Sequence, residues 1–196
     1  MGRLIYVVGP SGAGKNSVIA AAHKMLHQNK NLCFALRYVT RPGPDQGRDD
    51  EGDLAVSQSA FAQHRLSGLF ALDWQAHGCS YGIGIEINTE LRSGMTVVVN
   101  GSRAYAATAL KKYPVMTVVQ IVVSQDVART RLTTRAREDA AAIDARVRRA
   151  PPVFVPDDQL VTIDNGGPLE VAAVALTAVL LRSDRTQLVS HGTFVS

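Results

Sequence analysis

A glycine-rich segment near the N-terminus carries the residues best suited to chemistry. It follows an apolar run at residues 4–8, precedes a helical pattern at residues 15–28, and reads Gly9-Pro10-Ser11-Gly12-Ala13-Gly14-Lys15. This is the G-x-x-x-x-G-K spacing of a phosphate-binding loop in its strand–loop–helix context. Glycines let backbone N–H groups point at phosphate oxygens, and the helix N-terminus adds the positive end of its dipole. The segment predicts ATP binding through Gly9, Pro10, Ser11, Gly12, Ala13, Gly14, Lys15, Asn16 and Ser17.

The residue after the lysine departs from the usual pattern. That position normally carries a Ser or Thr hydroxyl that coordinates Mg²⁺, but here it is Asn16, followed by Ser17. An asparagine offers a carbonyl oxygen, and Ser17 could hydrogen-bond a phosphate. We therefore expect Mg²⁺ to accompany ATP, with Asn16 or Ser17 as its protein ligand.

Arginines gather in residues 129–149, and phosphoryl transfer needs such charges around the moving group. Arg135 and Arg137 lie at a break in the helical pattern, where we expect a mobile lid over about residues 133–146. Arg146 follows within reach of the same phosphates. We predict that Lys15, Arg135, Arg137 and Arg146 are catalytic, although any single arginine on a helix is often only a surface charge.

Polar residues at the ends of predicted strands are candidates for holding the phosphoryl acceptor. In open α/β sheets, ligands bind at the carboxyl ends of the strands. One group ends the predicted strand 36–39, and another follows the apolar strand 96–99. The candidates are Arg37, Tyr38, Arg41, Tyr81, Asn100, Ser102 and Arg103.

Apolar β-branched runs alternate with helical patterns, which predicts an α/β fold with a central parallel sheet and helical crossovers. The predicted strands are 4–8, 36–39, 70–76, 96–99, 116–123 and 160–163. The predicted helices are 15–28, a helix capped by Ser57 to about 66, 87–92, one capped by Ser102 to about 113, one capped by Ser124 to about 150, and a last helix to about 181. Residues 42–53 are rich in Gly, Pro and charge and predict a loop.

This pattern predicts one domain over residues 1–182, with an acceptor-binding region at about 36–92 and a loosely ordered polar tail at 183–196. The composition agrees, because 46% of the 196 residues are apolar and the net charge is only +4. The N-terminus lacks a secretory signal pattern, which predicts a cytoplasmic protein. Cys33 and Cys79 are expected to be reduced thiols. Neither a membrane nor a nucleic acid is expected as partner, since no apolar run is long enough and the arginines lack interleaved aromatics.

The chain resembles the guanylate kinase family over roughly residues 3–182. The matching features are the glycine-rich loop, Thr40-Arg41-Pro42, Tyr81-Gly82 and the lid arginines Arg135, Arg137 and Arg146. The resemblance implies a P-loop NTPase fold of the nucleoside-monophosphate-kinase type, with helices on both faces of the sheet and a lid. The positions that would read guanine are altered, because the family's glutamate falls at Leu72 and its aspartate at Asn100. A leucine cannot accept hydrogen bonds from a base.

A closer resemblance is to the ribose 1,5-bisphosphate phosphokinase family, which acts in bacterial phosphonate degradation. It rests on Arg37-Tyr38-x-Thr40-Arg41, Trp74-x-Ala76-His77-Gly78, Tyr81-Gly82-x-Gly84-x-Glu86-Ile87 and Val97-Val98-Val99-Asn100-Gly101-Ser102-Arg103. The resemblance implies transfer of the γ-phosphoryl group of ATP to ribose 1,5-bisphosphate, which gives 5-phosphoribosyl 1-diphosphate (PRPP). It implies that Arg37, Arg41 and Tyr81 hold acceptor phosphate, and that Asn100, Ser102 and Arg103 hold the ribose or its phosphates.

Two other functions remain open on the sequence. The first is a guanylate kinase or other nucleoside monophosphate kinase, which the residues at positions 72 and 100 disfavour. The second is a guanylate-kinase-like binding module without catalysis, which the intact Lys15 and lid arginines disfavour. The sequence does not decide whether the chain acts alone or as a homodimer.

Overall fold

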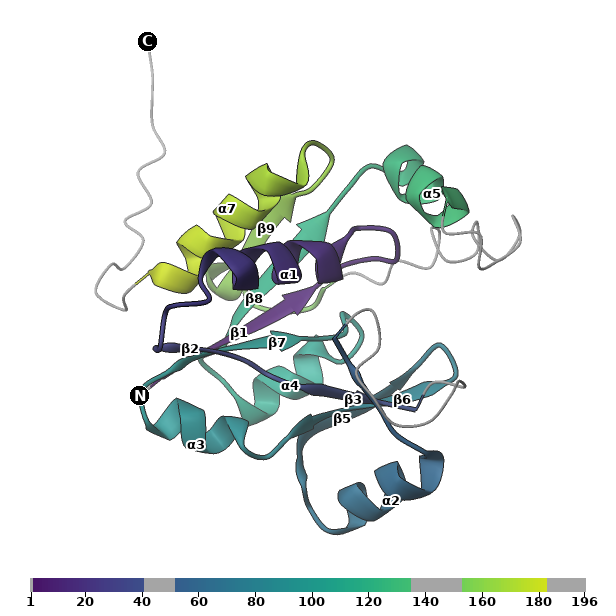
Figure 1. Ribbon diagram of the computed structural model, residues 1–196, viewed down its shortest axis with the longest axis vertical. Coiled ribbons are helices and arrows are strands. Elements are labelled where there is room, and N and C mark those ends of the chain that lie inside the picture. Colours follow the sequence, from purple (N-terminus) through teal and green to yellow (C-terminus); the bar gives the residue numbers. More distant parts are fainter. Residues whose placement is uncertain (1, 41–51, 135–152, 183–196) are drawn as a thin grey trace.

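The computed structural model of the chain describes residues 2–40, 52–134 and 153–182, which form two sheets with helices around them (Figure 1). The first sheet has five strands in the order β2-β7-β1-β8-β9, and the second has four in the order β4-β3-β6-β5. The strands are β1 (Arg3–Val8), β2 (Leu32–Phe34), β3 (Arg37–Val39), β4 (Leu54–Ala55), β5 (Phe70–Ala76), β6 (Cys79–Gly84), β7 (Thr96–Asn100), β8 (Thr117–Val122) and β9 (Leu160–Asp164). The helices are α1 (Lys15–Met25), α2 (Gln58–Leu66), α3 (Ile87–Arg92), α4 (Ala106–Lys112), α5 (Gln125–Thr134) and α7 (Leu169–Leu181).

Every neighbouring pair of strands in the first sheet is parallel, with β1 in the centre. The side chains of β1 alternate between two cores, as the period of a strand requires. Leu4 and Tyr6 lie in the core that also contains buried residues of α3, α4 and the second sheet. Ile5 and Val7 lie in the core shared with α1 and α7. Helices therefore cover both faces, α1 and α7 on one and α3 and α4 on the other (Figure 1), which confirms the predicted α/β fold with a central parallel sheet.

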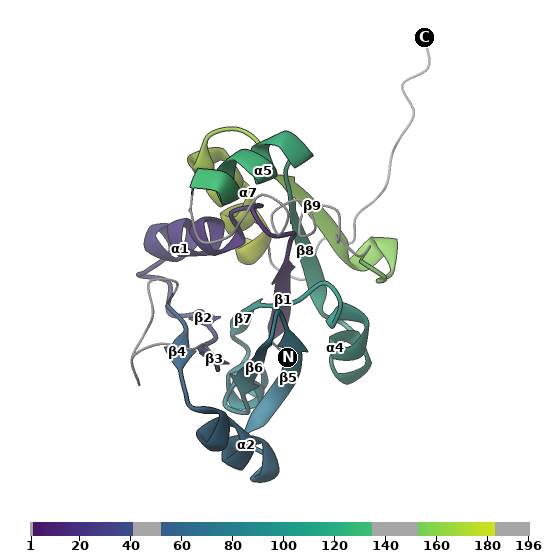
Figure 2. The ribbon, with the colours of Figure 1, turned by 90° about the vertical axis from the view of Figure 1, so that its right-hand side faces the viewer.

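The second sheet is mostly antiparallel and corrects the prediction that the strands at 36–39 and 70–76 belong to the parallel sheet. β3 pairs antiparallel with β6, β6 pairs antiparallel with β5, and β4 lies parallel to β3. β6 was not expected, because Gly82 and Gly84 are poor strand formers. Figure 2 shows this sheet and α2 on one side of the molecule, with α1 and α7 on the other. Arg37, Tyr38 and Tyr81, which lie on β3 and β6, thus belong to a sheet separate from the parallel one.

Helix boundaries test the predicted caps. The Ser57 Oγ accepts a hydrogen bond from the Ala60 N–H (3.1 Å), and the Ser124 Oγ accepts one from the Val127 N–H (3.3 Å), so both caps are confirmed. The predicted cap at Ser102 is wrong, since α4 begins at Ala106 and no side chain caps it. α1 ends at Met25, three residues earlier than predicted, and β2 and β4 were missed as strands.

The predicted lid arginines and the predicted tail at 183–196 lie outside the described residues. Within the described part, no helix combines the length and apolar character needed to cross a membrane.

Candidate active site

The glycine-rich loop joins the end of β1 to the start of α1. Gly12 and Gly14 have left-handed backbone conformations, with φ of +81° and +75°. Neighbouring atoms also exclude larger side chains, because a Cβ would lie 2.7 Å from the Ala128 carbonyl oxygen at Gly12 and 2.6 Å from the Asn165 Nδ2 at Gly14. The packing therefore requires glycine at these two positions of the predicted loop. The same contacts show that α5 and the segment after β9 lie directly against the loop.

Arg131 and Asn165 hold these neighbouring segments against the loop. The Asn165 side chain donates to the Ala13 carbonyl oxygen (2.7 Å), and the Arg131 guanidinium donates to the Asn165 carbonyl oxygen (2.9 Å). The Arg131 Nη1 and Asn165 Oδ1 atoms are buried without a hydrogen-bond partner in the part of the chain that the structure describes. Buried polar atoms of this kind normally find a partner. A phosphate oxygen at the loop could accept from the Arg131 Nη1, whereas the Asn165 Oδ1 would need a donor.

Neither residue was singled out from the sequence. Arg131 belongs to the arginine-rich stretch, so its residue type indicated a possible phosphate contact. Nothing in the local sequence indicated that its position on α5 places it against the loop. Asn165 precedes two glycines and was interpreted only as part of a turn. Its contact with the loop depends on the parallel pairing of β8 and β9, which no local pattern reveals.

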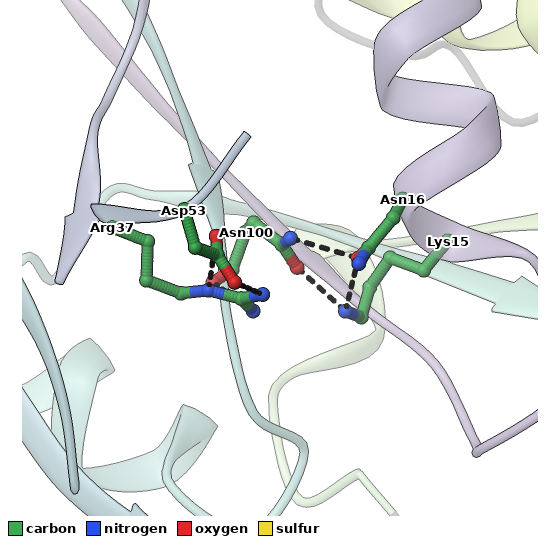
Figure 3. Close-up of polar contacts among 5 residues, drawn as sticks. All are labelled: Lys15, Asn16, Arg37, Asp53 and Asn100. Atoms are coloured by element: carbon green, nitrogen blue, oxygen red, sulfur yellow. Dashed lines mark hydrogen bonds and ion pairs between the residues drawn. The ribbon is translucent and has the colours of Figure 1, made fainter. Parts of the chain in front are cut away.

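Lys15 lies at the centre of a small polar network (Figure 3). Its ammonium group donates to the Asn100 Oδ1 (2.5 Å) and to the Asn16 Oδ1 (3.4 Å). The Asn100 side chain in turn donates from Nδ2 to the Asn16 Oδ1 (2.9 Å). Asn100 is the last residue of β7 and pairs in register with Val7 of β1, which places it beside the loop. The structure thus brings Asn100 to Lys15 and Asn16, which precede it by 85 and 84 residues in the sequence.

Arg37 lies on the other side of Asn100 and is almost fully buried. Its guanidinium forms a bidentate ion pair with Asp53, with distances of 2.9 and 2.5 Å, and a third nitrogen lies 3.4 Å from the Asn100 carbonyl oxygen (Figure 3). The Tyr81 ring lies beneath it, 5.2 Å from the guanidinium carbon. Arg37 opens β3, and Tyr81 lies inside β6, so neither stands at the carboxyl end of a parallel strand as expected. Asp53 was not singled out from the sequence, because it closes a loop rich in charges.

Aromatic rings continue from Tyr81 away from Arg37. Trp74 stacks between Tyr81 and Tyr105, with ring centroids 5.6 Å apart in each pair. An open pocket of about 420 Å³ lies over the outer part of this stack, with Gln75 and Ser102 among its lining residues. The stack fixes Tyr81 from one side while Arg37 fixes it from the other, so the phenol ring has little freedom.

Tyr6 anchors the segment that follows β7. Its hydroxyl accepts a hydrogen bond from the Ser102 N–H (3.0 Å) and donates to the Ser102 carbonyl oxygen (3.3 Å). Burial raises the pKa of Tyr6 well above its ordinary value, so the phenol stays protonated and can donate. Gly101 is required here, because a Cβ would overlap the Tyr6 ring. Arg103 follows half-buried, and burial lowers the pKa of its guanidinium.

The structure separates the remaining predicted residues. Tyr38 packs edge-on against Phe70 and His64, next to α2, while its neighbour Arg37 contacts Tyr81 in the layer that faces the parallel sheet. A role for Tyr38 in acceptor binding stays a prediction. Leu72 is 1% exposed and belongs to the core, so it faces no ligand. The predicted residues outside the described part are Arg41, Arg135, Arg137 and Arg146; α5 ends at Thr134, directly before Arg135.

Comparison with known proteins gives close relatives over nearly the whole chain. No family model matches. The chain is 44% identical over 183 residues to ribose 1,5-bisphosphate phosphokinase PhnN of Desulfomicrobium baculatum, which covers 93% of this chain and 96% of that protein. It is 44% identical to the protein of the same name in Burkholderia pseudomallei, covering 91% and 95%. It is 40% identical to that of Thiobacillus denitrificans, covering 95% and 96%.

Two solved structures share the fold at low sequence identity. The guanylate kinase of Anaplasma phagocytophilum superposes with a TM-score of 0.63 and 16% identity, over 91% of this chain and 84% of that one. A sugar kinase of a Janibacter species superposes with a TM-score of 0.52 and 14% identity, over 91% and 94%. The likeness to guanylate kinase, together with the five-stranded parallel sheet, confirms the predicted P-loop NTPase fold.

Proposed function

The chain belongs to the ribose 1,5-bisphosphate phosphokinase family, and we propose that it transfers the γ-phosphoryl group of ATP to ribose 1,5-bisphosphate. The products are ADP and 5-phosphoribosyl 1-diphosphate. One observation supports this most directly. Lys15 of the phosphate-binding loop and Arg37 of the acceptor layer both contact Asn100, through its side chain and its carbonyl oxygen. Donor and acceptor sites built on these residues adjoin, as direct transfer between two bound molecules requires.

On the donor side, the backbone N–H groups of the loop and the start of α1 would hold the phosphates of ATP. Lys15 would leave its contact with Asn100 and pair with the β- and γ-phosphates. A charged group that moves with the phosphoryl group stabilises the transition state more than the ground state, which is the requirement for catalysis. Arg135, Arg137 and Arg146 are proposed to neutralise the migrating group and to close over it as a lid.

On the acceptor side, Arg37 and Tyr81 would contact one phosphate, and Arg41 would add a further charge. Ser102 and Arg103 follow β7 and would contact the ribose or its phosphates. The attacking atom is an oxygen of the 1-phosphate. It is already ionised at neutral pH, so no general base has to remove a proton from it. Catalysis in this proposal rests on positioning and on electrostatic stabilisation.

Mg²⁺ normally bridges the β- and γ-phosphates in kinases and neutralises part of their charge. The residues described here do not fit a metal site built by the protein in the usual way. The amide oxygens of Asn16 and Asn100 both accept hydrogen bonds from the cationic ammonium of Lys15. In addition, the described residues contain no group of three His, Cys, Asp or Glu side chains that could hold a metal.

The decisive experiment is detection of 5-phosphoribosyl 1-diphosphate by mass spectrometry after incubation of the protein with ATP and ribose 1,5-bisphosphate. ADP release should be measured in parallel with GMP, AMP and CMP as acceptors. We expect ribose 1,5-bisphosphate to be strongly preferred, because the position expected to read guanine is the buried Leu72. ADP release with GMP alone would instead establish a nucleoside monophosphate kinase, and absence of ATP binding by calorimetry would favour a binding module.

A further inference from the structure

Asn100 occupies a position from which a carboxylate would share a metal with the phosphate-binding loop. In P-loop NTPases, Mg²⁺ is held by the loop's Ser or Thr hydroxyl and by an aspartate. Here the residue after the loop lysine is Asn16, and the side chain that reaches it from the neighbouring strand is Asn100, at 2.9 Å. Both positions of this contact therefore hold amides, where a hydroxyl and a carboxylate could share a metal.

The two amides are chemically matched to each other. Asn100 donates from Nδ2 to the Asn16 Oδ1, which leaves its own Oδ1 free to accept from the Lys15 ammonium at 2.5 Å. An aspartate at position 100 would be an acceptor only, so it could not donate to the Asn16 Oδ1; the Asn16 amide would have to turn its Nδ2 toward the aspartate and give up its contact with Lys15. An asparagine at position 100 therefore suits an asparagine at position 16, because one amide donates where the other accepts.

Asn100 also lies where a negative charge would interfere with both substrates. Its carbonyl oxygen faces Arg37 on the acceptor side, and its side chain holds Lys15 on the donor side (Figure 3). A carboxylate there would form an ion pair with Lys15 and would repel both the triphosphate and a doubly phosphorylated acceptor. A neutral amide can orient Lys15 through a hydrogen bond. It attracts the ammonium less strongly than a carboxylate would, so it competes less with the phosphates of ATP.

We propose that Asn16 and Asn100 form a matched amide pair in place of a charged metal site at these two positions, so that Mg²⁺ entering with ATP would gain no charged ligand from them. Asn100 is then a positioning residue for Lys15. This inference rests on the proposed role of ATP as phosphoryl donor. It predicts that metal-free nucleotide binds about as well as its Mg²⁺ complex, because neither position 16 nor position 100 offers a carboxylate to the metal.

The test measures binding of the non-hydrolysable ATP analogue AMP-PNP by calorimetry, once with Mg²⁺ and once with EDTA. For the unaltered protein, we expect the two dissociation constants to agree within about threefold. For Asn100→Asp, we expect weaker binding in EDTA, because the new carboxylate repels bare phosphate. We also expect the ratio of the dissociation constant in EDTA to that in Mg²⁺ to rise by about tenfold or more, because the carboxylate attracts the metal. Asn16→Ser combined with Asn100→Asp should give a ratio at least as large.

Asn31→Asp is the matched control, because it adds the same charge at an exposed residue before β2. Its ratio should equal that of the unaltered protein. The inference is overturned if Mg²⁺ tightens binding to the unaltered protein by about tenfold or more, or if Asn100→Asp leaves the ratio unchanged. These results would leave the proposed function standing, whereas absence of AMP-PNP binding in both buffers would overturn ATP as donor and this inference with it.

Discussion

The ion pair between Arg37 and Asp53 is the interaction whose loss should be felt most in the stability of the protein. Both side chains are almost fully buried, with exposed fractions of 7% and 4%, and they join through two hydrogen bonds of 2.9 and 2.5 Å. Asp53→Asn retains the shape of the side chain but removes its charge. The guanidinium of Arg37 would then remain buried without the carboxylate of Asp53.

Removing one partner of a buried ion pair typically costs about 3–5 kcal/mol, because the remaining charge keeps its desolvation penalty. The neighbouring groups reduce this only in part. The Asn100 carbonyl oxygen lies 3.4 Å from one guanidinium nitrogen, at the limit of a hydrogen bond, and the Tyr81 ring is 5.2 Å from the guanidinium carbon. For a chain of this size, the loss corresponds to a fall in Tm of about 10 °C.

The assay is urea unfolding at neutral pH, with the free energy of unfolding taken by linear extrapolation. Asp73→Asn is the matched control, because Asp73 pairs at 3.1 Å with Arg65, whose side chain is 64% exposed, and this solvent-accessible pair should contribute less than about 1 kcal/mol. Replacing both partners at once, as in Arg37→Met with Asp53→Leu, should destabilise the protein less than Asp53→Asn does. Equal losses for Asp53→Asn and Asp73→Asn would refute the reasoning.

Four further outcomes follow from the same geometry. Lys15→Ala should lower turnover by about 10²–10³-fold or more in steady-state kinetics while the circular dichroism spectrum is retained; undiminished activity would end its assignment. Gly101→Ala should cost about 1–3 kcal/mol in urea unfolding, since its Cβ overlaps the Tyr6 ring. Leu72→Glu should destabilise the core by several kcal/mol, on the order of a buried unpaired polar group, and should not create phosphorylation of GMP. Burial raises the pKa of Cys33, so iodoacetamide should label it more slowly than a free thiol at pH 8 and faster as pH rises, which peptide mass spectrometry can follow.

The parts of the fold that the sequence predicted are those fixed by local pattern. The phosphate-binding loop needs glycines at fixed spacing, and β1 and β7 are continuous apolar runs of the kind buried in a parallel sheet. Ser57 and Ser124 cap helices through bonds to residues three positions away, so their roles are also local. Short-range physics decides these features, and the sequence pattern therefore reports them.

The second sheet escaped prediction as a sheet, although β3 and β5 were expected as strands, because β3 and β4 are short and β3 pairs with a strand distant in the chain. β3 has three residues and pairs with β6, more than forty positions later. The pairing of Arg37 with Asp53 has the same origin, since nothing near Asp53 distinguishes it from the other acidic residues of its segment. Asn165 reaches the phosphate-binding loop because it directly follows β9, which lies in the same sheet as β1. Tertiary packing decides these contacts, so a single sequence could not reveal them.

The charges around Asn100 explain why this site suits an anionic acceptor better than a purine base. A guanine reader needs acidic acceptors, yet the two positions concerned hold a core leucine and an amide already bonded to Lys15. Among the described residues, Asp53 brings an acidic side chain there, but it faces Arg37 and neutralises it. Arg37 therefore contributes oriented N–H donors more than net charge. Arg103 differs, because its half-buried guanidinium has no hydrogen-bond or ion-pair partner among the described residues and is available to a phosphate.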